Sequence, residues 1–528
     1  MTRTRSTHSR DDSPVPRCLC LYLIGIAMLA AMLTTAGHAE AVTSPGKTSV
    51  DRPARLKPHL GGTVVPPNIA PLNFVILEPG GRYTVRLHGA HGNPIDLATR
   101  QAVVELPARR WRDLLAANRG GSLHLDMSVQ NDSGQWTAFQ SVSFGVAQEE
   151  IDSHLVYRFI KPLHNWWKDV AIYQRNLEAF DRSVVLNGNT FGDGCVNCHS
   201  FQNNAPDRMF IGIRSAVHGS ATLLAEPDRV NKIGAKWGYT AWHPQGNLAA
   251  YSINKVHQFF HTGAAEVRDV VDLDSAILYY SLDTQQVQTA PGLSDPQRLE
   301  TYPTWSPDGK YLYFCSAPIL WSDRQTVPPM RYDKVKYDLM RIRFNIEQDT
   351  WGEPETVLSA EQTGLSILLP RISPDGRFLV CSMCEYGCFP IYQPSSDLYR
   401  VDLQTGAYRR MDCNSRFAES WHSFSSNGRW LAFSSKRRGG LFTRTFITYL
   451  DKNGKEHKPF ILPQLDPTYY DSCLQTFSVP ELITGPVKVR QRKLAKAITQ
   501  DKTIEITLPI TGATPKASVS GGPYRERE

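Results

Sequence analysis

The sequence predicts a mainly β protein whose largest part is a β-propeller of five or six blades. A turn motif recurs four times, and an alternating apolar strand follows each copy. Strand-like segments with a similar pattern lie between the copies, so each unit has enough strands for a four-stranded blade. The turn copies span residues 242–252, 305–314, 372–380 and 424–434, and the intervening segments are 276–282, 337–342 and 397–403.

The chemistry of the repeated turn predicts tight hairpins. In each copy an apolar or aromatic residue precedes Pro or Ser, then Asp, Asn or Gln, and then Gly. The Asp-Gly and Asn-Gly pairs supply the positive-φ positions that such turns need. The first copy departs from the pattern, because Pro244-Gln245-Gly246 stands where two others have Pro-Asp-Gly. An irregular β-sandwich is the alternative architecture.

These repeats resemble the blades of TolB-type propellers, which carry S-P-D-G-[KR] turns like those at 306–310 and 373–377. Residues 150 to about 485 more closely resemble a group of exported bacterial proteins in which a C-V-N-C-H-S-F element directly precedes a TolB-like propeller. The resemblance implies a propeller and a haem-carrying segment, and it implies no particular reaction. The matching stretches are 149–160, 172–180, 195–201, 301–317 and 426–437.

The run Cys195-Val196-Asn197-Cys198-His199 is a C-x-x-C-H motif, the attachment signature of a c-type haem. We expect Cys195 and Cys198 to lie about one turn apart and to form thioethers with one covalent haem c, and His199 to be the proximal iron ligand. Met209 is a candidate distal ligand, with His218 as a second candidate. The alternative is an ordinary cysteine pair followed by an unrelated histidine.

Three functions remain open for such a chain. The first is an exported mono-haem cytochrome that transfers electrons, with the propeller as the docking platform for a redox partner. The second is a TolB-like protein-binding scaffold in which haem is structural or sensory, and the third is a haem oxidoreductase. The sequence contains no Ser-His-Asp order, no G-x-S-x-G elbow and no phosphate-binding glycine loop, so it favours neither a hydrolase nor a nucleotide-binding protein.

The N-terminus predicts export to the periplasm. Four arginines precede an apolar run from Cys18 to Leu33, and Ala39-Glu40-Ala41 is a cleavage candidate. An uncleaved run would instead be a membrane anchor, and no other span is expected. We therefore expect a periplasmic redox or envelope protein as partner. Nucleic acid is not expected, because the formal net charge of +7 comes from +2 in residues 1–17 and +5 in residues 486–528.

Six further cysteines allow disulfides in an oxidising compartment. Cys315 and Cys381 each end an apolar strand, where a thiol commonly acts as a small core residue. The pairing of the others cannot be deduced, and a zinc site lacks a matching second pair. The six are Cys315, Cys381, Cys384, Cys388, Cys413 and Cys473.

Composition and periodicity divide the chain into six segments. Residues 1–41 are a signal peptide, followed by a linker, a small antiparallel sandwich-like domain, a helical or loop segment with the haem motif, the propeller, and a basic disordered tail. The boundaries after the signal are 42–70, 71–148, 149–207, 208–486 and 487–528.

Overall fold

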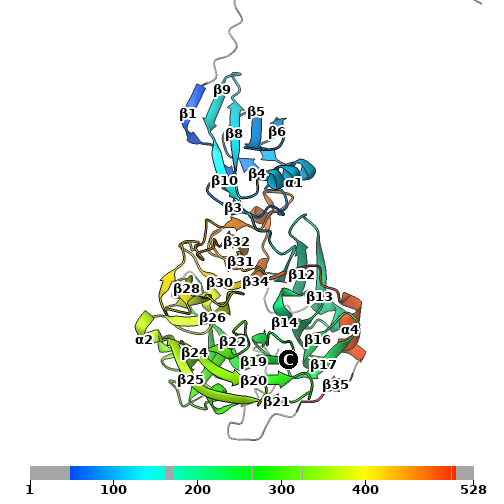
Figure 1. Cartoon of the computed structure of the whole chain (residues 1–528), viewed down its shortest axis with the longest axis vertical. Coiled ribbons are helices and arrows are strands. Elements are labelled where there is room, and N and C mark those ends of the chain that lie inside the picture. The colour runs from blue at the N-terminus through cyan, green and yellow to red at the C-terminus, as the bar shows by residue number, and fades with distance from the viewer. Residues whose placement is uncertain (1–47, 162–169, 263–265, 324, 501, 507–528) are drawn as a thin grey trace, which may run out of the picture. The chain divides into compact units, whose positions relative to one another are not determined.

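A computed structural model describes residues 48–161, 170–262, 266–323, 325–500 and 502–506. The protein is mainly β, as predicted (Figure 1). The signal peptide expected over 1–41 lies outside the described residues. None of the helices in the described ranges is long and apolar enough to cross a membrane.

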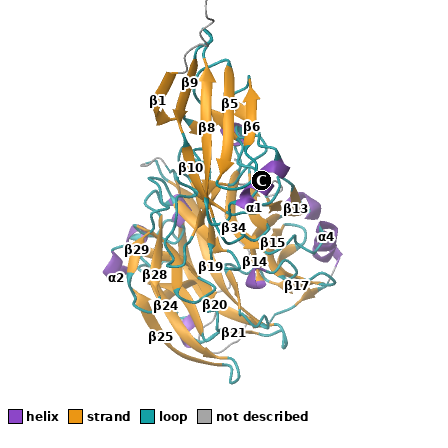
Figure 2. Ribbon diagram, turned by 45° about the horizontal axis from the view of Figure 1, so that its top comes forward, coloured by secondary structure: helices purple, strands orange, loops and turns teal. Residues whose placement is uncertain are grey.

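Within the described residues, six antiparallel sheets of four strands each follow one another, and one of them gains a short fifth strand (Figure 2). Three of them, written from the first strand outward, are β34 (Thr476–Ile483), β11 (His154–Ile160), β12 (Ala171–Asn176), β13 (Arg182–Asn187); β14 (Cys195–Phe201), β15 (Met209–Ser215), β16 (Gly219–Ala225), β17 (Val230–Gly234); and β18 (Thr240–Trp242), β19 (Leu248–Phe260), β20 (Arg268–Ser281), β21 (Val287–Gln288).

The other three sheets have the same order. They are β22 (Arg298–Trp305), β23 (Tyr311–Pro318), β24 (Asp338–Asn345), β25 (Thr350–Leu358); β26 (Ser366–Ile372), β27 (Phe378–Cys384), β28 (Asp397–Asp402), β29 (Tyr408–Arg410); and β30 (Glu419–Phe424), β31 (Trp430–Ser435), β32 (Arg444–Tyr449), β33 (Phe460–Ile461).

The first strands of the six sheets contact one another in a ring. β14 contacts β18, β18 contacts β22, and the series continues through β26 and β30 to β34, which in turn contacts β14. β34 comes from the C-terminal part of the chain but pairs antiparallel with β11, with Leu155 opposite Leu482. The first sheet is thus completed by a strand from the far end of the described chain, an arrangement that leaves no first strand unpaired.

The predicted tight turns are present in all four copies. Gly246, Gly309, Gly376 and Gly428 have φ between 68° and 80°. In the copy at 306–310, Ser306 Oγ lies 2.6 Å from Asp308 Oδ1, which also accepts the Lys310 N–H at 3.1 Å. The copies at 373–377 and 425–429 repeat both contacts. The Asp or Asn side chain therefore closes the turn, and the glycine supplies its left-handed residue.

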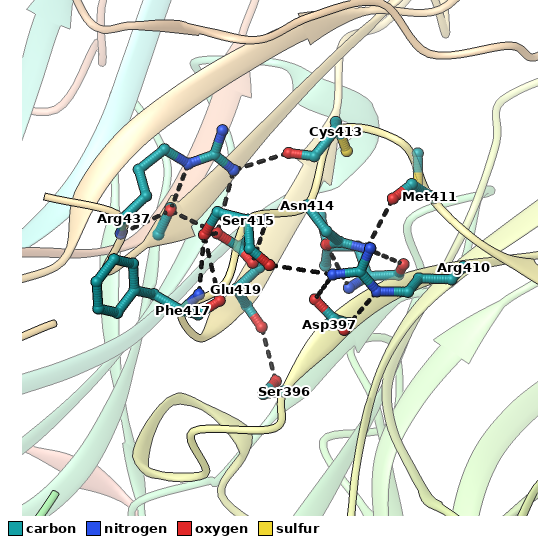
Figure 3. Close-up of polar contacts among 12 residues, drawn as sticks. Ser396, Asp397, Arg410, Met411, Cys413, Asn414, Ser415, Phe417, Glu419 and Arg437 are labelled. Atoms are coloured by element: carbon teal, nitrogen blue, oxygen red, sulfur yellow. Dashed lines mark hydrogen bonds and ion pairs between the residues drawn. The ribbon is translucent and has the colours of Figure 1, made fainter. Parts of the chain in front are cut away.

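A polar network joins the sheet that contains β28 to the sheet that contains β30 (Figure 3). Glu419, fully buried at the start of β30, accepts hydrogen bonds from Ser415 Oγ and Ser435 Oγ, both at 2.7 Å, and from Arg437 Nη2 at 3.1 Å. Arg410 donates to both carboxylate oxygens of Asp397 and to the Ser415 carbonyl. The buried Glu419 carboxylate is thus fully partnered, which offsets the cost of burying it, whereas the Arg410 side chain is 47% exposed.

Three of the predicted segments are wrong in part. Residues 149–207 are not helical, because β11, β12, β13 and β14 are strands there, and the sheets of the ring therefore begin well before residue 208. The basic tail is not disordered at its start, since α4 (Gln491–Gln500) and β35 (Thr503–Ile504) follow residue 487. α4 buries Leu494, Ala497 and Ile498, and β35 pairs with β17.

The N-terminal region is β-rich but differs from the prediction. One sheet contains β1 (Thr48–Pro53), β3 (Val64–Val65), β5 (Arg82–Gly89), β6 (Ile95–Thr99), β8 (Ser122–Gln130), β9 (Trp136–Gln140) and β10 (Val142–Val146), and a second contains β2 (Leu56–Lys57), β4 (Phe74–Ile76) and β7 (Val103–Val104). The predicted linker over 42–70 is therefore wrong from Thr48 onward. The helix α1 (Ala108–Ala117), which buries Trp111 and Leu114, was not expected.

A disulfide across the β11–β34 pair tests ring closure. Ile160 lies opposite Thr476, and both are only partly buried, so Ile160→Cys with Thr476→Cys should oxidise to an intramolecular disulfide. We expect a faster-migrating band on a non-reducing gel and a stability gain of about 2–4 kcal/mol. Ile160→Cys with Thr503→Cys is the control, because these positions belong to different sheets. Equal cross-linking of both pairs would contradict this closure.

Candidate functional site

Five of the six first strands contain a bulge with a left-handed, non-glycine residue. Each of these residues has φ between 43° and 56° and lies where the register with the second strand shifts. A bulge turns its side chain out of the regular alternation of the strand. The five residues are Cys198 in β14, Tyr302 in β22, Leu369 in β26, Trp421 in β30 and Val479 in β34.

Four of these bulge residues and Tyr239 meet in one hydrophobic cluster, here called the axial cluster: Tyr239, Tyr302, Leu369, Trp421 and Val479. The Tyr239 ring lies 4.1 Å from the Tyr302 ring and 5.7 Å from the Trp421 ring, measured between centroids. The fifth bulge residue, Cys198, interacts electrostatically with Tyr239, whose pKa is raised mainly by burial. The haem motif therefore lies where the first strands of the ring converge.

The C-x-x-C-H motif is extended, so the predicted turn is wrong. Cys195 to Phe201 form β14, and Cys198 is its bulge. Cys195 pairs with Arg214, whereas His199 pairs with Ile211. These two partners are three residues apart on β15, which pairs regularly with β16, so they face opposite sides of the sheet. Cys195 and His199 consequently project in opposite directions.

This divergence bears on the predicted haem. Covalent attachment with His199 as ligand needs both thiols and the imidazole at one porphyrin, and the register of β14 does not bring Cys195 to the His199 face. His199 by itself has the environment of a ligand, because both ring nitrogens are buried without a hydrogen-bond partner among the described residues. The three residues together do not fit one haem in this strand, and covalent haem stays a prediction.

His199 is neutral in this environment. Its side chain is 1% exposed, and burial lowers its pKa to about 3, with the nearby Arg158 charge acting in the same direction and the Val479 backbone opposing it. The nearest carboxylate oxygen, Glu481 Oε2, lies 3.7 Å from Nε2. Glu481 Oε1 accepts the Phe201 N–H at 2.8 Å, and burial raises the pKa of Glu481 to about 7 despite the positive charge of Arg371.

Neither candidate distal ligand, Met209 or His218, lies opposite the His199 imidazole. Met209 is 1% exposed on β15, where it pairs with Phe201 and packs with Ile211 and Ile213 in the core. It projects from the same sheet face as His199, so it does not oppose the imidazole across a common site. His218 lies in the turn between β15 and β16. The placement of Met209 is that of a core residue.

The eight cysteines in the described ranges are all free thiols. All are buried except Cys198, which is partly exposed. Cys315 and Cys381 are core residues of β23 and β27, as expected, and burial raises the pKa of both thiols. No group of three His, Cys, Asp or Glu suited to a metal ion occurs in the described part of the chain.

The long β19–β20 hairpin crosses from its own sheet to sheets that are not its neighbours in the ring. Asp269 Oδ2 accepts a hydrogen bond from Tyr386 Oη at 2.9 Å, and its Oδ1 accepts one from Gln393 Nε2 at 3.0 Å. Glu266, three residues before Asp269 and just ahead of β20, forms an ion pair with Lys436, which follows β31. These contacts place the hairpin over the axial cluster, and Val270 of β20 belongs to that same hydrophobic core. The sequence indicated strands here but not their length.

Comparisons with known proteins give a fold likeness only. No protein-family model matches the sequence, and no curated protein matches it. Among solved structures, TolB from Acinetobacter baumannii has a TM-score of 0.40 and 13% identity, over 68% of this chain and 79% of that chain. The nidogen/laminin complex has a TM-score of 0.36 and 9% identity, over 63% of this chain and 99% of that chain. Prolyl oligopeptidase B from Galerina marginata has a TM-score of 0.33 and 11% identity, over 64% of this chain and 43% of that chain.

The exposure of Cys198 predicts selective thiol chemistry. In the native protein we expect Cys198 to react with a thiol reagent before any other cysteine of residues 48–506, because the other seven are buried. Cys198→Ser should remove this fast phase, and Cys315→Ser should leave it unchanged. Mass spectrometry of labelled peptides measures the order. Labelling of Cys195 or Cys388 ahead of Cys198 would contradict the described burial.

Glu300 predicts a pH-dependent stability. It is 1% exposed on β22, its Oε2 has no hydrogen-bond partner among the described residues, and burial raises its pKa to about 8. The folded state then holds a proton that the unfolded state releases above about pH 4.5, so stability falls as pH rises from 4.5 to 8. Glu300→Gln should reduce this fall, and the part that remains comes from other buried carboxyls with raised pKa values, such as Glu481. Urea unfolding at pH 5 and pH 8.5 measures it, and an unchanged pH slope in the variant would refute the assignment.

Proposed function

We propose that this chain is an exported binding protein of the TolB kind, in which the six sheets are the blades of a propeller and a face of the propeller docks a protein of the cell envelope. The ring of first strands supports six blades. Export and a periplasmic location rest on the N-terminal sequence. The observation that carries the proposal is the exposed apolar surface on the β19–β20 hairpin and the neighbouring β23–β24 loop.

This docking surface contains Val267, Val327 and Met330. Met330 is 86% exposed, Val267 is 45% exposed and Val327 is 36% exposed. The Phe259 and Tyr332 rings, 5.0 Å apart between centroids, hold the loop against the hairpin. Exposed apolar side chains on a hairpin and on the loop that packs against it are typical of a protein-interaction site.

A second candidate function is the mono-haem c-type cytochrome, with Cys195 and Cys198 as thioether residues and His199 as the proximal ligand. The buried, unpartnered nitrogens of His199 favour it. The register of β14 opposes it, because residues 195–199 would have to leave their pairing with β15 to face one porphyrin. The haem would supply electron transfer, and the docking surface would then receive a redox partner.

A photo-crosslinking experiment tests the binding function. A photoreactive amino acid replaces Met330 in the full chain in an exporting host, and the cross-linked protein is identified and then bound to the purified chain. We expect Met330→Asp to weaken that binding by about tenfold or more. Val217→Asp is the matched control, because Val217 is 72% exposed on another turn.

The paired variant Cys195→Ala/Cys198→Ala separates the two candidate functions. If the chain is a binding scaffold, the variant should still bind the cross-linked partner. If the chain is a cytochrome, the variant should no longer transfer electrons to that partner. Equal binding of the partner by the Met330→Asp and Val217→Asp variants would contradict the docking proposal, as would the absence of any cross-link.

A further inference from the structure

The basic segment after β34 packs on the ring through a helix that leaves one side free. Residues 482–500 contain five Lys or Arg residues and no Asp or Glu. α4 packs its buried apolar side against β13, β16, β17 and the short helix η2 (Gly188–Phe191), on the outer rim of the ring (Figure 1). Lys232 Nζ of β17 donates to the Ile498 carbonyl at 3.0 Å, which caps the last turn of α4. The polar side of the helix therefore faces outward.

Four cations lie on this outward side and on the residues that lead into it. All four residues are exposed, and none of their side chains forms an ion pair or a hydrogen bond with another residue in the described ranges. The fifth cation, Lys493, is partly buried and donates to the Pro227 carbonyl at 2.9 Å. The four exposed residues, here called the basic face, are Lys488, Arg490, Arg492 and Lys496.

The surroundings of the basic face add little negative charge. The four elements that α4 packs against contain one Arg and one Lys but no Asp or Glu. The turn between β16 and β17 contains Glu226 and Asp228, and Glu226 is already paired with Arg208 and Arg229. Asp228 is the remaining carboxylate of that turn. The basic face therefore keeps a net positive charge, which attracts anions.

We propose that the basic face binds an anionic membrane surface through the phosphate groups of phospholipids. Phosphate oxygens are preferred partners of guanidinium and ammonium groups. Clusters of Lys and Arg on an amphipathic helix are typical of proteins that bind anionic lipids. The apolar side of α4 is buried against the ring, so the helix lies on the headgroups and does not insert into the bilayer. Membrane contact uses a different surface and a different partner from the protein docking proposed above, and it extends that function.

Vesicle co-sedimentation of the full chain tests this contact. Vesicles of phosphatidylcholine alone are compared with vesicles that also contain phosphatidylglycerol, at low and at high salt. We expect tighter binding to the phosphatidylglycerol vesicles, and weaker binding at high salt because the exposed charges are screened. Arg492→Gln with Lys496→Gln should weaken binding to the anionic vesicles by about tenfold or more. The N-terminal residues are the same in every variant, so their contribution cancels in the comparison.

A matched variant separates the basic face from net charge. Arg109→Gln with Arg112→Gln removes the same charge from exposed positions on α1 and should bind the anionic vesicles as the wild type does. Thermal unfolding should show both paired variants to be as stable as the wild type, because the replaced side chains have no partner in the described ranges. Arg490→Gln, just before α4, is the second variant of the basic face if the first does not fold.

Three results would overturn the inference. They are equal loss of vesicle binding in both paired variants, equal binding of the wild type to the two kinds of vesicle, and tighter binding to immobilised polyglutamate than to vesicles of equal charge. The last result would assign the basic face to an acidic protein. The cross-link at Met330 is scored on the same variants. A retained cross-link without binding to anionic vesicles overturns the membrane contact and leaves the docking function intact, whereas vesicle binding without a cross-link does the reverse.

Discussion

The pairing of β34 with β11 is the constraint on which the arrangement of the ring depends. The first strand of one sheet comes from residues 476–483, and its three partners come from residues 154–187. This pairing brings β34 against both β14 and β30, which closes the series of first strands. Without it, β11 would be an unpaired edge, and Val479 and Glu481 would not meet the residues of β14. The surroundings of the C-x-x-C-H motif on β14 therefore depend on this pairing.

The bulges explain why a recognisable motif acquires an unexpected geometry. A C-x-x-C-H run on a helical turn would direct its side chains to one side. In β14, the left-handed Cys198 turns toward the axial cluster, while Cys195 and His199 keep the alternation imposed by β15. Left-handed bulge residues also occur at Tyr302, Leu369 and Trp421. Local sequence cannot reveal this, because the bulge depends on the strand that pairs with it.

The predictions that succeeded rest on local chemistry. The Ser-Pro-Asp-Gly turns, the strands after them, and Cys315 and Cys381 as core residues were all visible in short windows. The failures concern pairing over long distances. The strands of 154–187 lack a repeated turn, and Thr48–Pro53 is a strand because it pairs with β9. α4 is amphipathic but lies in a basic stretch, so its charge concealed the residues that it buries. Glu300 carried no sequence signal at all, since its importance comes from burial.

The presence or absence of covalent haem tests the account most directly. The exported chain would be purified from a host with c-type maturation, denatured, and measured as a reduced pyridine haemochrome beside Cys195→Ala/Cys198→Ala. Because the register of β14 separates Cys195 from His199, the account predicts a folded, cooperatively unfolding chain without haem c in either protein. A c-type spectrum that survives denaturation in the wild type and vanishes in the variant would contradict this geometry and establish the cytochrome.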